Sequence, residues 1–284
     1  MAQKRVAAIH DISCFGKCSL TVALPILSAA GIECTVLPTA VLSTHTGGFT
    51  GYTFRDLTED VKPIADHWKS VGIGFDAIYS GYLGSFEQLK LVGDFYDEFR
   101  GKDTLVITDP VMADNGKLYA SFASDFPKGM AKLCEKSDII IPNLTEATLM
   151  LGEEYPGDDY DKDYIEKLLK RLASLGRGKV VLTGVSFEEG RLGSASYDSA
   201  TGEYGYAFAD KVDGYYHGTG DVYGSALVAA ILKGKPLAEA IGIAVDFTVE
   251  SIVRTKQAGT DIRFGVDFEE SLPNFMKNVG ISAK

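Results

Sequence analysis

Short apolar runs alternate with longer amphipathic segments along the whole chain of 284 residues. The short runs are rich in Val and Ile, which is typical of buried strands. The longer segments repeat apolar residues at helical spacing, and several end at Gly. This pattern predicts strands over 5–10, 33–38, 75–81, 103–112, 138–143 and 179–184. It predicts helices over 19–31, 57–72, 85–101, 125–137, 161–176, 221–233 and 237–256, and a short helix that Asn143 caps.

Strands that alternate with helices favour an α/β fold, with a mostly parallel central sheet and helices on both faces. Residues 191–213 differ, because turn residues interrupt an alternating pattern there, as in antiparallel strands. They predict a short antiparallel extension at one edge of the sheet. A loop is expected over 39–54, and two helices are expected to close the chain. Since no linker or repeat interrupts the pattern, we expect a single domain over 1–284.

Composition narrows the choice of partners. Apolar residues make up 45% of the chain and charged residues 24%, as in ordinary globular proteins. The net charge of −11 repels nucleic acid and anionic membranes, so neither is expected as a partner. No secretory signal is apparent, and no stretch reaches the roughly 18 apolar residues that a membrane helix needs. The four cysteines show no disulfide framework, which favours reduced thiols and a cytoplasmic location.

Small and polar residues follow the expected strand ends. In open α/β sheets, ligands bind outside the carboxyl ends of the strands. We therefore expect one pocket there, and the candidate segments are Asp11, THTGG (44–48), GYLG (81–84), DPV (109–111), PN (142–143) and TG (183–184).

The motif HGTGD (217–221) directly precedes a helix rich in Gly, Ala and Ser. Gly218 and Gly220 allow a sharp turn, so that backbone N–H groups around Thr219 can converge on an anion. The helix dipole adds positive potential and is expected to favour the ionised form of Asp221. A proton acceptor beside a phosphate-binding turn indicates a reaction in which an alcohol substrate loses its proton as its oxygen attacks phosphorus. Alternatively, the motif is a plain strand–helix turn in which Asp221 is a capping residue.

Two further patterns do not carry chemistry. FGKCS (15–19) resembles the end of a P-loop, but Cys18 and Asp11 stand where that motif needs Ser or Thr and Gly. His10, Cys14 and Cys18 recur every four residues, yet no second Cys or His pair completes a zinc site.

No G-x-G-x-x-G follows the first strand, which argues against a nicotinamide dehydrogenase.

HGTGD before a small-residue helix is similar to the anion-hole signature of the ribokinase superfamily. Within that superfamily, SGYLGS (80–85), DPVM (109–112) and DIIIPNLTEATLMLG (138–152) resemble the pyridoxal (vitamin B6) kinases. The resemblance covers nearly the whole chain and keeps the order of the motifs. It implies a ribokinase-like fold and ATP-dependent phosphorylation of the 5′-hydroxymethyl group of pyridoxal, pyridoxamine or pyridoxine.

The resemblance also implies roles for residues on the vitamin side. Asp221 would take the proton from the 5′-hydroxyl, and Gly218, Thr219 and Gly220 would stabilise the transferring γ-phosphoryl group. Tyr82 would lie near the pyridine ring, where its aromatic face can stack. Asp11 would lie next to the ring, and the positions expected to contact ring substituents are Thr39, Thr46 and Gly47.

On the nucleotide side, the resemblance implies Mg²⁺ with ATP. Asp109 and Glu146 would act through Mg²⁺ and water on the phosphates, as hard oxygen ligands do. Tyr119 lies in a segment that would cover the phosphates as a flap. The remaining expected contacts are Asn143 and Thr183 along the triphosphate, and Lys211 and Val212 at the nucleotide edge. A homodimer is expected from the resemblance alone, and a monovalent cation beside Mg²⁺ is left open.

The chain departs from the family at two positions. Many relatives have Ser where Asp11 stands, which leaves the preferred vitamer open, and Thr or Ala where Ile141 stands. The nearest competing function is a hydroxymethylpyrimidine kinase of thiamine synthesis, although those enzymes often carry Cys in place of Asp221. A sugar kinase, and a non-catalytic vitamer-binding protein on the same scaffold, stay open as well.

Overall fold

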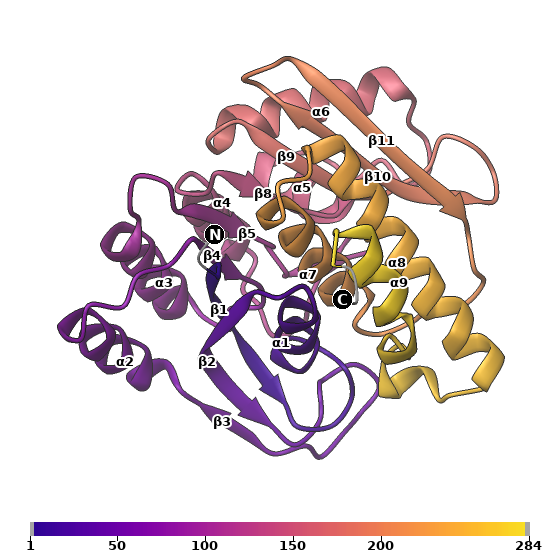
Figure 1. Ribbon diagram of the computed structural model, residues 1–284. Helices are drawn as coiled ribbons and strands as arrows, with labels where there is room; N and C mark the ends of the chain where they lie inside the picture. Colours follow the sequence, from indigo (N-terminus) through magenta and orange to yellow (C-terminus); the bar gives the residue numbers. More distant parts are fainter. Residues whose placement is uncertain (1–2, 282–284) are drawn as a thin grey trace.

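The computed structural model describes residues 3–281, and its centre is a nine-stranded sheet of order β11-β10-β9-β8-β5-β4-β1-β2-β3 (Figure 1). The strands from β9 to β2 are parallel to one another. This confirms the α/β fold that the alternation predicts. The bounds of the parallel strands are β1 (Arg5–Ser13), β2 (Glu33–Leu42), β4 (Ala77–Ser80), β5 (Leu105–Thr108), β8 (Ile139–Ile140) and β9 (Lys179–Val185).

Antiparallel strands flank this parallel block. The predicted edge extension is confirmed as β10 (Arg191–Asp198) and β11 (Glu203–Asp210), which follow β9 in the sheet. At the other edge, β3 (Phe54–Asp56) pairs with the last residues of β2. The prediction of a loop over 39–54 is therefore wrong at both ends, because residues 39–42 belong to β2 and residue 54 begins β3. β2 continues because its backbone still pairs with β1, and the exposed residues of β3 give no apolar pattern that sequence reasoning could detect.

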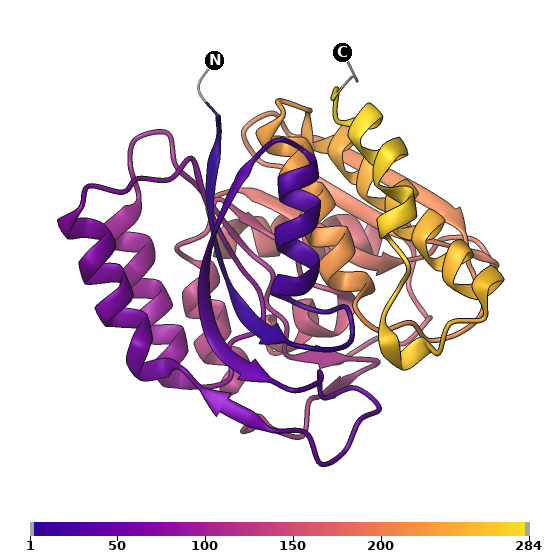
Figure 2. The same ribbon diagram turned by 60° about the horizontal axis from the view of Figure 1, so that its bottom comes forward.

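Helices cover both faces of the sheet (Figures 1 and 2). The helices on one face are α1 (Leu20–Ala29), α7 (Thr219–Leu232), α8 (Leu237–Ala258) and α9 (Leu272–Asn278). Those on the other are α2 (Thr58–Ser70), α3 (Phe86–Phe99), α4 (Phe126–Cys134), α5 (Leu144–Leu151) and α6 (Lys162–Leu175). The expectation that two helices close the chain is wrong, because η1 (Ile262–Phe264), η2 (Glu269–Ser271) and α9 follow α8. These segments are too short to display a helical period.

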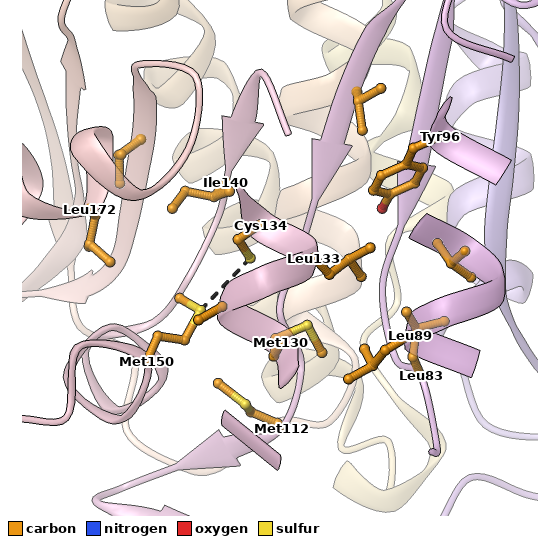
Figure 3. Packing of buried hydrophobic residues seen from close by; sticks show 14 of the residues in the cluster. Leu83, Leu89, Tyr96, Met112, Met130, Leu133, Cys134, Ile140, Met150 and Leu172 are labelled. Carbon is orange, nitrogen blue, oxygen red and sulfur yellow. Dashed lines mark hydrogen bonds between the residues drawn. The ribbon is translucent and has the colours of Figure 1, made fainter. Parts of the chain in front are cut away.

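The parallel strands are apolar on both faces because each face has its own core. Val6 and Ile107 pack in the cluster beneath α1 and α7, whereas their neighbours Ala7 and Val106 pack in the cluster beneath α3 and α4. Figure 3 shows the second cluster, where the Cys134 thiol lies 3.8 Å from the Met150 sulfur. All four cysteines are free thiols. Among residues 3–281, no helix has both the length and the apolarity to cross a membrane.

The carboxyl ends of the parallel strands meet along one edge of the sheet, toward which the arrows of β1 and β2 point in Figure 2. The predicted first strand ended at His10, but β1 continues through Asp11 to Ser13. The register shifts between His10, which lies opposite Pro38, and Ile12, which lies opposite Val41. Two residues of β2, Thr39 and Ala40, therefore lie opposite Asp11, as in a β-bulge of β2, which is a common way to direct a side chain toward a site.

Candidate active site

The loop before α7 turns as the glycines in HGTGD suggested. Gly218 has φ 76°, a left-handed conformation that favours glycine. A Cβ at this position would also lie 2.0 Å from the carbonyl oxygen of Lys17, so no other residue fits without movement. Gly218 caps α7 without a side-chain hydrogen bond, and the space beside Gly220 is open. The first-turn N–H groups near Thr219 are therefore free to bind an anion.

Asp221 lies in the first turn of α7 and is half-buried. Burial raises the pKa of this carboxyl to about 7, the Ser19 backbone N–H opposes the rise, and the charge of Asp11 adds to it. The expectation that the helix terminus favours the ionised form is thus wrong, because desolvation outweighs the favourable N–H groups. A carboxyl with a pKa near 7 is well matched to accept a proton at neutral pH.

Asp11, which lies in β1 opposite the irregularity of β2, is only 6% exposed. Its carboxylate accepts hydrogen bonds from the Ser19 hydroxyl at 2.6 Å and from the Ser13 hydroxyl at 3.2 Å. Burial raises the pKa of Asp11, and these two hydroxyls oppose the rise. Asp11 also lies near enough to Asp221 for its charge to raise the pKa of that carboxyl.

The loop after β2 reaches the loop before α7 through two histidines. His45 accepts a hydrogen bond from the Gly47 N–H at 3.1 Å, and its other ring nitrogen lies 2.5 Å from the carbonyl oxygen of Arg263. The His45 and His217 rings lie 5.0 Å apart. The loop that carries Thr46 and Gly47 is thus held beside HGTGD, and the Thr46 side chain is exposed there. Thr39 differs from these residues, because it is buried within β2 at 1% exposure.

The SGYLGS segment follows β4 and packs closely on its neighbours. A Cβ at Gly81 would lie 2.4 Å from the imidazole of His10, so the segment needs glycine there. Tyr82 is half-buried, and its ring centroid lies 5.6 Å from that of Phe122. Burial raises the pKa of the Tyr82 hydroxyl, and the charge of Asp11 contributes to the rise. Tyr82 therefore lies within reach of the charge of Asp11.

A second group of acids lies beyond β5 and β8. Asn143 caps α5 in a capping box, in which its side chain accepts the Glu146 N–H and Glu146 accepts the Asn143 N–H, each at 2.9 Å. Glu146 also accepts the Met112 N–H at 3.0 Å. Burial raises the pKa of Glu146 to about 8. For Asp109, burial and the charges of Glu146 and Asp221 raise the pKa well above its usual value.

The predicted flap is a β-hairpin of β6 (Ala113–Asp114) and β7 (Lys117–Leu118) with Asn115 and Gly116 at its turn. Both turn residues have positive φ, at 50° and 74°. Tyr119 follows β7, and the charge of Glu146 contributes, after burial, to raising the pKa of its hydroxyl. Tyr119 thus lies on the side of the second acid group.

The remaining nucleotide candidates lie along β9 and β11. Thr183 forms a bridge with Asn143, and its N–H donates to the carbonyl of Pro142 at 3.0 Å, so it adjoins the capped end of α5. Lys211 is exposed, and its N–H donates to the carbonyl of Gly190 at 2.8 Å. Lys211 and Val212 are therefore held by the antiparallel edge strands rather than by contacts with the acids.

A resident metal centre built from protein side chains is not found within residues 3–281, where no three His, Cys, Asp or Glu residues are grouped to hold an ion. Both carboxylate oxygens of Glu146 already accept backbone N–H groups. For Asp109, no hydrogen bond from another described residue offsets the effect of burial on its pKa. This donor set fits a cation held chiefly by other oxygen ligands, with Asp109 as the carboxylate available to it.

Sequence comparison places this chain in a known family. Residues 24–264 match the model of the phosphomethylpyrimidine kinase family. The chain belongs to that family. A hydroxymethylpyrimidine/phosphomethylpyrimidine kinase from Aquifex aeolicus is 30% identical over 71% of this chain and 74% of its own length. A pyridoxine/pyridoxal/pyridoxamine kinase from Bordetella avium is 26% identical over 89% of this chain and 86% of its own length.

Solved structures agree with this family assignment. The pyridoxal kinase of Lactobacillus plantarum has a TM-score of 0.89 and 30% identity, covering 97% of this chain and 98% of that one. A Bacteroides thetaiotaomicron protein that carries a phosphomethylpyrimidine kinase assignment was crystallised with pyridoxal. It has a TM-score of 0.92 and 37% identity over 96% of both chains. The resemblance to the pyridoxal kinases of the ribokinase superfamily is therefore confirmed, and the chain is a kinase of this type.

Sequence reasoning missed three residues that shape the site. The rings of His45 and His217 join the loop after β2 to the loop before α7. Both residues lie inside motifs, THTGG and HGTGD, that were interpreted from their glycine residues alone. The Ser19 hydroxyl donates to the Asp11 carboxylate, but the helical context of Ser19 gave no sign of this. Its role depends on a backbone conformation that only the structure reveals.

Proposed function

We propose that this kinase phosphorylates the 5′-hydroxymethyl group of a B6 vitamer with ATP. The observation that carries the proposal is the position of Asp221, in the first turn of α7 beside the Gly218 turn and its free N–H groups. A proton acceptor and an anion-binding helix end then face the same place. The names of the Bordetella avium and Lactobacillus plantarum relatives, and the pyridoxal in the Bacteroides structure, support this substrate class.

The proposed mechanism is a direct in-line transfer. Asp221 takes the proton of the substrate hydroxyl as its oxygen attacks the γ-phosphorus, and the bond from that phosphorus to the β-phosphate oxygen breaks to release ADP. Backbone N–H groups of residues 218–221 stabilise the charge on the transferring phosphoryl group. Asp221 later loses the proton to solvent, so no covalent phospho-enzyme is needed.

The second acid group is proposed to serve the nucleotide. Asp109 and Glu146 would hold Mg²⁺ through water and the ATP phosphates, and the ion would neutralise phosphate charge when bound. Asn143 and Thr183 would line the triphosphate, Lys211 and Val212 would lie at the nucleotide edge, and Tyr119 on its hairpin would cover the phosphates. The homodimer and the monovalent cation remain predictions.

A hydroxymethylpyrimidine is the second candidate substrate, because the family model and the Aquifex aeolicus relative carry that activity in their names. Both candidates present a hydroxymethyl group on a flat heteroaromatic ring. The carboxylate at Asp221 favours the B6 vitamers, since the pyrimidine kinases often carry Cys there.

The test is ADP release from Mg·ATP, measured with pyridoxal, pyridoxamine, pyridoxine and hydroxymethylpyrimidine under identical conditions. We expect turnover with at least one B6 vitamer, at a kcat/KM well above that for the pyrimidine. Turnover with the pyrimidine alone would assign the chain to thiamine synthesis. Binding of a vitamer with no ADP release in any assay would indicate a non-catalytic binding protein.

A further inference from the structure

An exposed tyrosine connects the loop before α7 with the hairpin of β6 and β7. The Tyr215 side chain is 54% exposed, and its ring packs edge-on against His217, with the ring centroids 5.1 Å apart and an angle of 82° between the rings. The Tyr215 hydroxyl donates to the Asp114 carboxylate of β6 at 3.4 Å. Because so much of the ring is exposed, burial of apolar area gives little reason for a tyrosine here. Its contacts with His217 and Asp114 therefore account for the residue better than core packing does.

The fold of the loop directs Tyr215 toward the hairpin. Gly214 has φ 124°, and a Cβ there would lie 2.8 Å from the ring of Tyr216, so the turn needs glycine. The Tyr216 hydroxyl returns to the same loop and donates to the carbonyl of Asp213 at 3.1 Å. Two adjacent tyrosines thus differ in their partners, because Tyr216 bonds within the loop and Tyr215 bonds to the hairpin.

The other hydrogen bonds of the hairpin go to α5 and its cap. The Gly116 N–H donates to the Thr145 hydroxyl at 2.9 Å, and the Asn143 side-chain amide donates to the Ala113 carbonyl at 2.8 Å. In the described part of the chain, Tyr215 is the only hydrogen-bond partner that the hairpin has outside α5 and the cap of that helix. It therefore supplies the link between the hairpin and the anion-binding turn.

We propose that Tyr215 is a positioning residue, which holds the hairpin of β6 and β7 against the loop before α7 and so keeps Tyr119 over the nucleotide phosphates. This inference rests on the proposed function, in which Tyr119 covers the phosphates. The hydroxyl contact of 3.4 Å is longer than a usual O–H···O bond, so the hairpin opens at little cost when nucleotide enters or leaves. Burial and the charge of Asp114 raise the pKa of the Tyr215 hydroxyl, which therefore keeps its proton and stays a donor.

Two tyrosine variants separate this role from a general effect on the loop. Tyr215→Phe keeps the ring against His217 and removes only the hydroxyl. Tyr216→Phe is the matched control, because it removes a hydroxyl from the adjacent residue whose bond stays within the loop. Asp114→Ala and the double variant with Tyr215→Phe complete a double-mutant cycle, which subtracts the bonds that Asp114 makes to Asn115.

Three measurements are made on each variant. Calorimetry gives the Kd for Mg·ADP, and hydrogen exchange with mass spectrometry follows the amides of residues 113–118 without nucleotide. Steady-state kinetics give the KM for ATP and the KM for the vitamer.

We expect Tyr215→Phe to weaken the binding of Mg·ADP about three- to fivefold and to speed amide exchange of the hairpin by a similar factor, because the hairpin opens more often without this bond. The KM for ATP should rise, whereas the KM for the vitamer should not. Tyr216→Phe should match the wild type in every measurement. The double variant should bind Mg·ADP as Asp114→Ala does, because the two side chains act through one bond.

Wild-type affinity and wild-type exchange in Tyr215→Phe would overturn the proposal. Equal losses in Tyr215→Phe and Tyr216→Phe would also overturn it, since they would assign the effect to the fold of the loop, and so would additive losses in the double variant. Amide exchange without nucleotide tests the contact separately from the proposed function. Faster exchange in Tyr215→Phe supports the contact even if no tested alcohol is phosphorylated, and unchanged exchange contradicts it even if the kinase assignment holds.

Discussion

The α-carbon of Gly47 lies against the imidazole of His217, so that a Cβ at position 47 would be 2.5 Å from the ring. This contact joins the loop after β2 to the loop that begins α7. We predict that Gly47→Ala separates the two loops and raises the KM for the alcohol about tenfold, with a smaller effect on kcat. Steady-state kinetics with the best vitamer from the substrate panel measure this effect.

Gly74→Ala is the matched control, because the φ of Gly74 lies outside the left-handed region and a Cβ there meets no atom within 4 Å. Its kinetics should equal those of the wild type. A wild-type KM in Gly47→Ala would mean that His217 rotates away without cost and that the two loops act independently.

Asp221→Asn tests the proposed base with little change in shape. The amide is close in size to the carboxyl, but it cannot take a proton from the alcohol. We expect kcat to fall by roughly 10²–10⁴ while vitamer binding persists. In the wild type, kcat/KM should rise with pH through about 7, because burial raises the pKa of Asp221 to about 7 and only the ionised form accepts a proton. Retention of wild-type turnover in Asp221→Asn would remove Asp221 from the mechanism.

The same variant should be more stable than the wild type. In the unfolded chain the Asp221 carboxyl titrates near 3.8, whereas in the folded protein its pKa is about 7. Between these values the unfolded state releases a proton that the folded state keeps, so the free energy of unfolding falls as pH rises. The Asp221→Asn variant has no titrating carboxyl at this position, so its free energy of unfolding does not fall with pH in this way. Its free energy of unfolding should exceed that of the wild type by about 2 kcal/mol near pH 8. The difference should vanish near pH 4, and chemical denaturation at both pH values measures it.

The sequence was most informative where one interaction dominates. Alternating apolar runs predict the parallel sheet because burial on both faces leaves few other arrangements, and Gly218 is identifiable because its turn excludes side chains. Where interactions compete, sequence reasoning failed. At Asp221, the prediction from sequence considered the helix dipole, which lowers the pKa. It did not consider desolvation, which raises the pKa by more. It could not identify the role of Ser19, since a strained φ and a contact with Asp11 depend on how the segment before α1 folds back on β1.

The β6–β7 hairpin was missed although the Asn-Gly pair at its turn is a strong hairpin signal, because its two strands are too short to show an alternating pattern. The hairpin is held against α5, where the Gly116 N–H donates to the Thr145 hydroxyl at 2.9 Å. A Cβ at Gly116 would lie 2.7 Å from the ring of Tyr155. We therefore predict that Gly116→Ala displaces the hairpin that carries Tyr119.

If Tyr119 covers the phosphates, Gly116→Ala should raise the KM for ATP about tenfold and leave the KM for the vitamer nearly unchanged. Gly157→Ala separates displacement from backbone strain. Gly157 also has positive φ, at 62°, but a Cβ there meets no atom within 4 Å. The control should lose stability without a change in the KM for ATP. Equal KM values for ATP in both variants would mean that the hairpin does not contact the nucleotide, and Tyr119 would then have only a structural role.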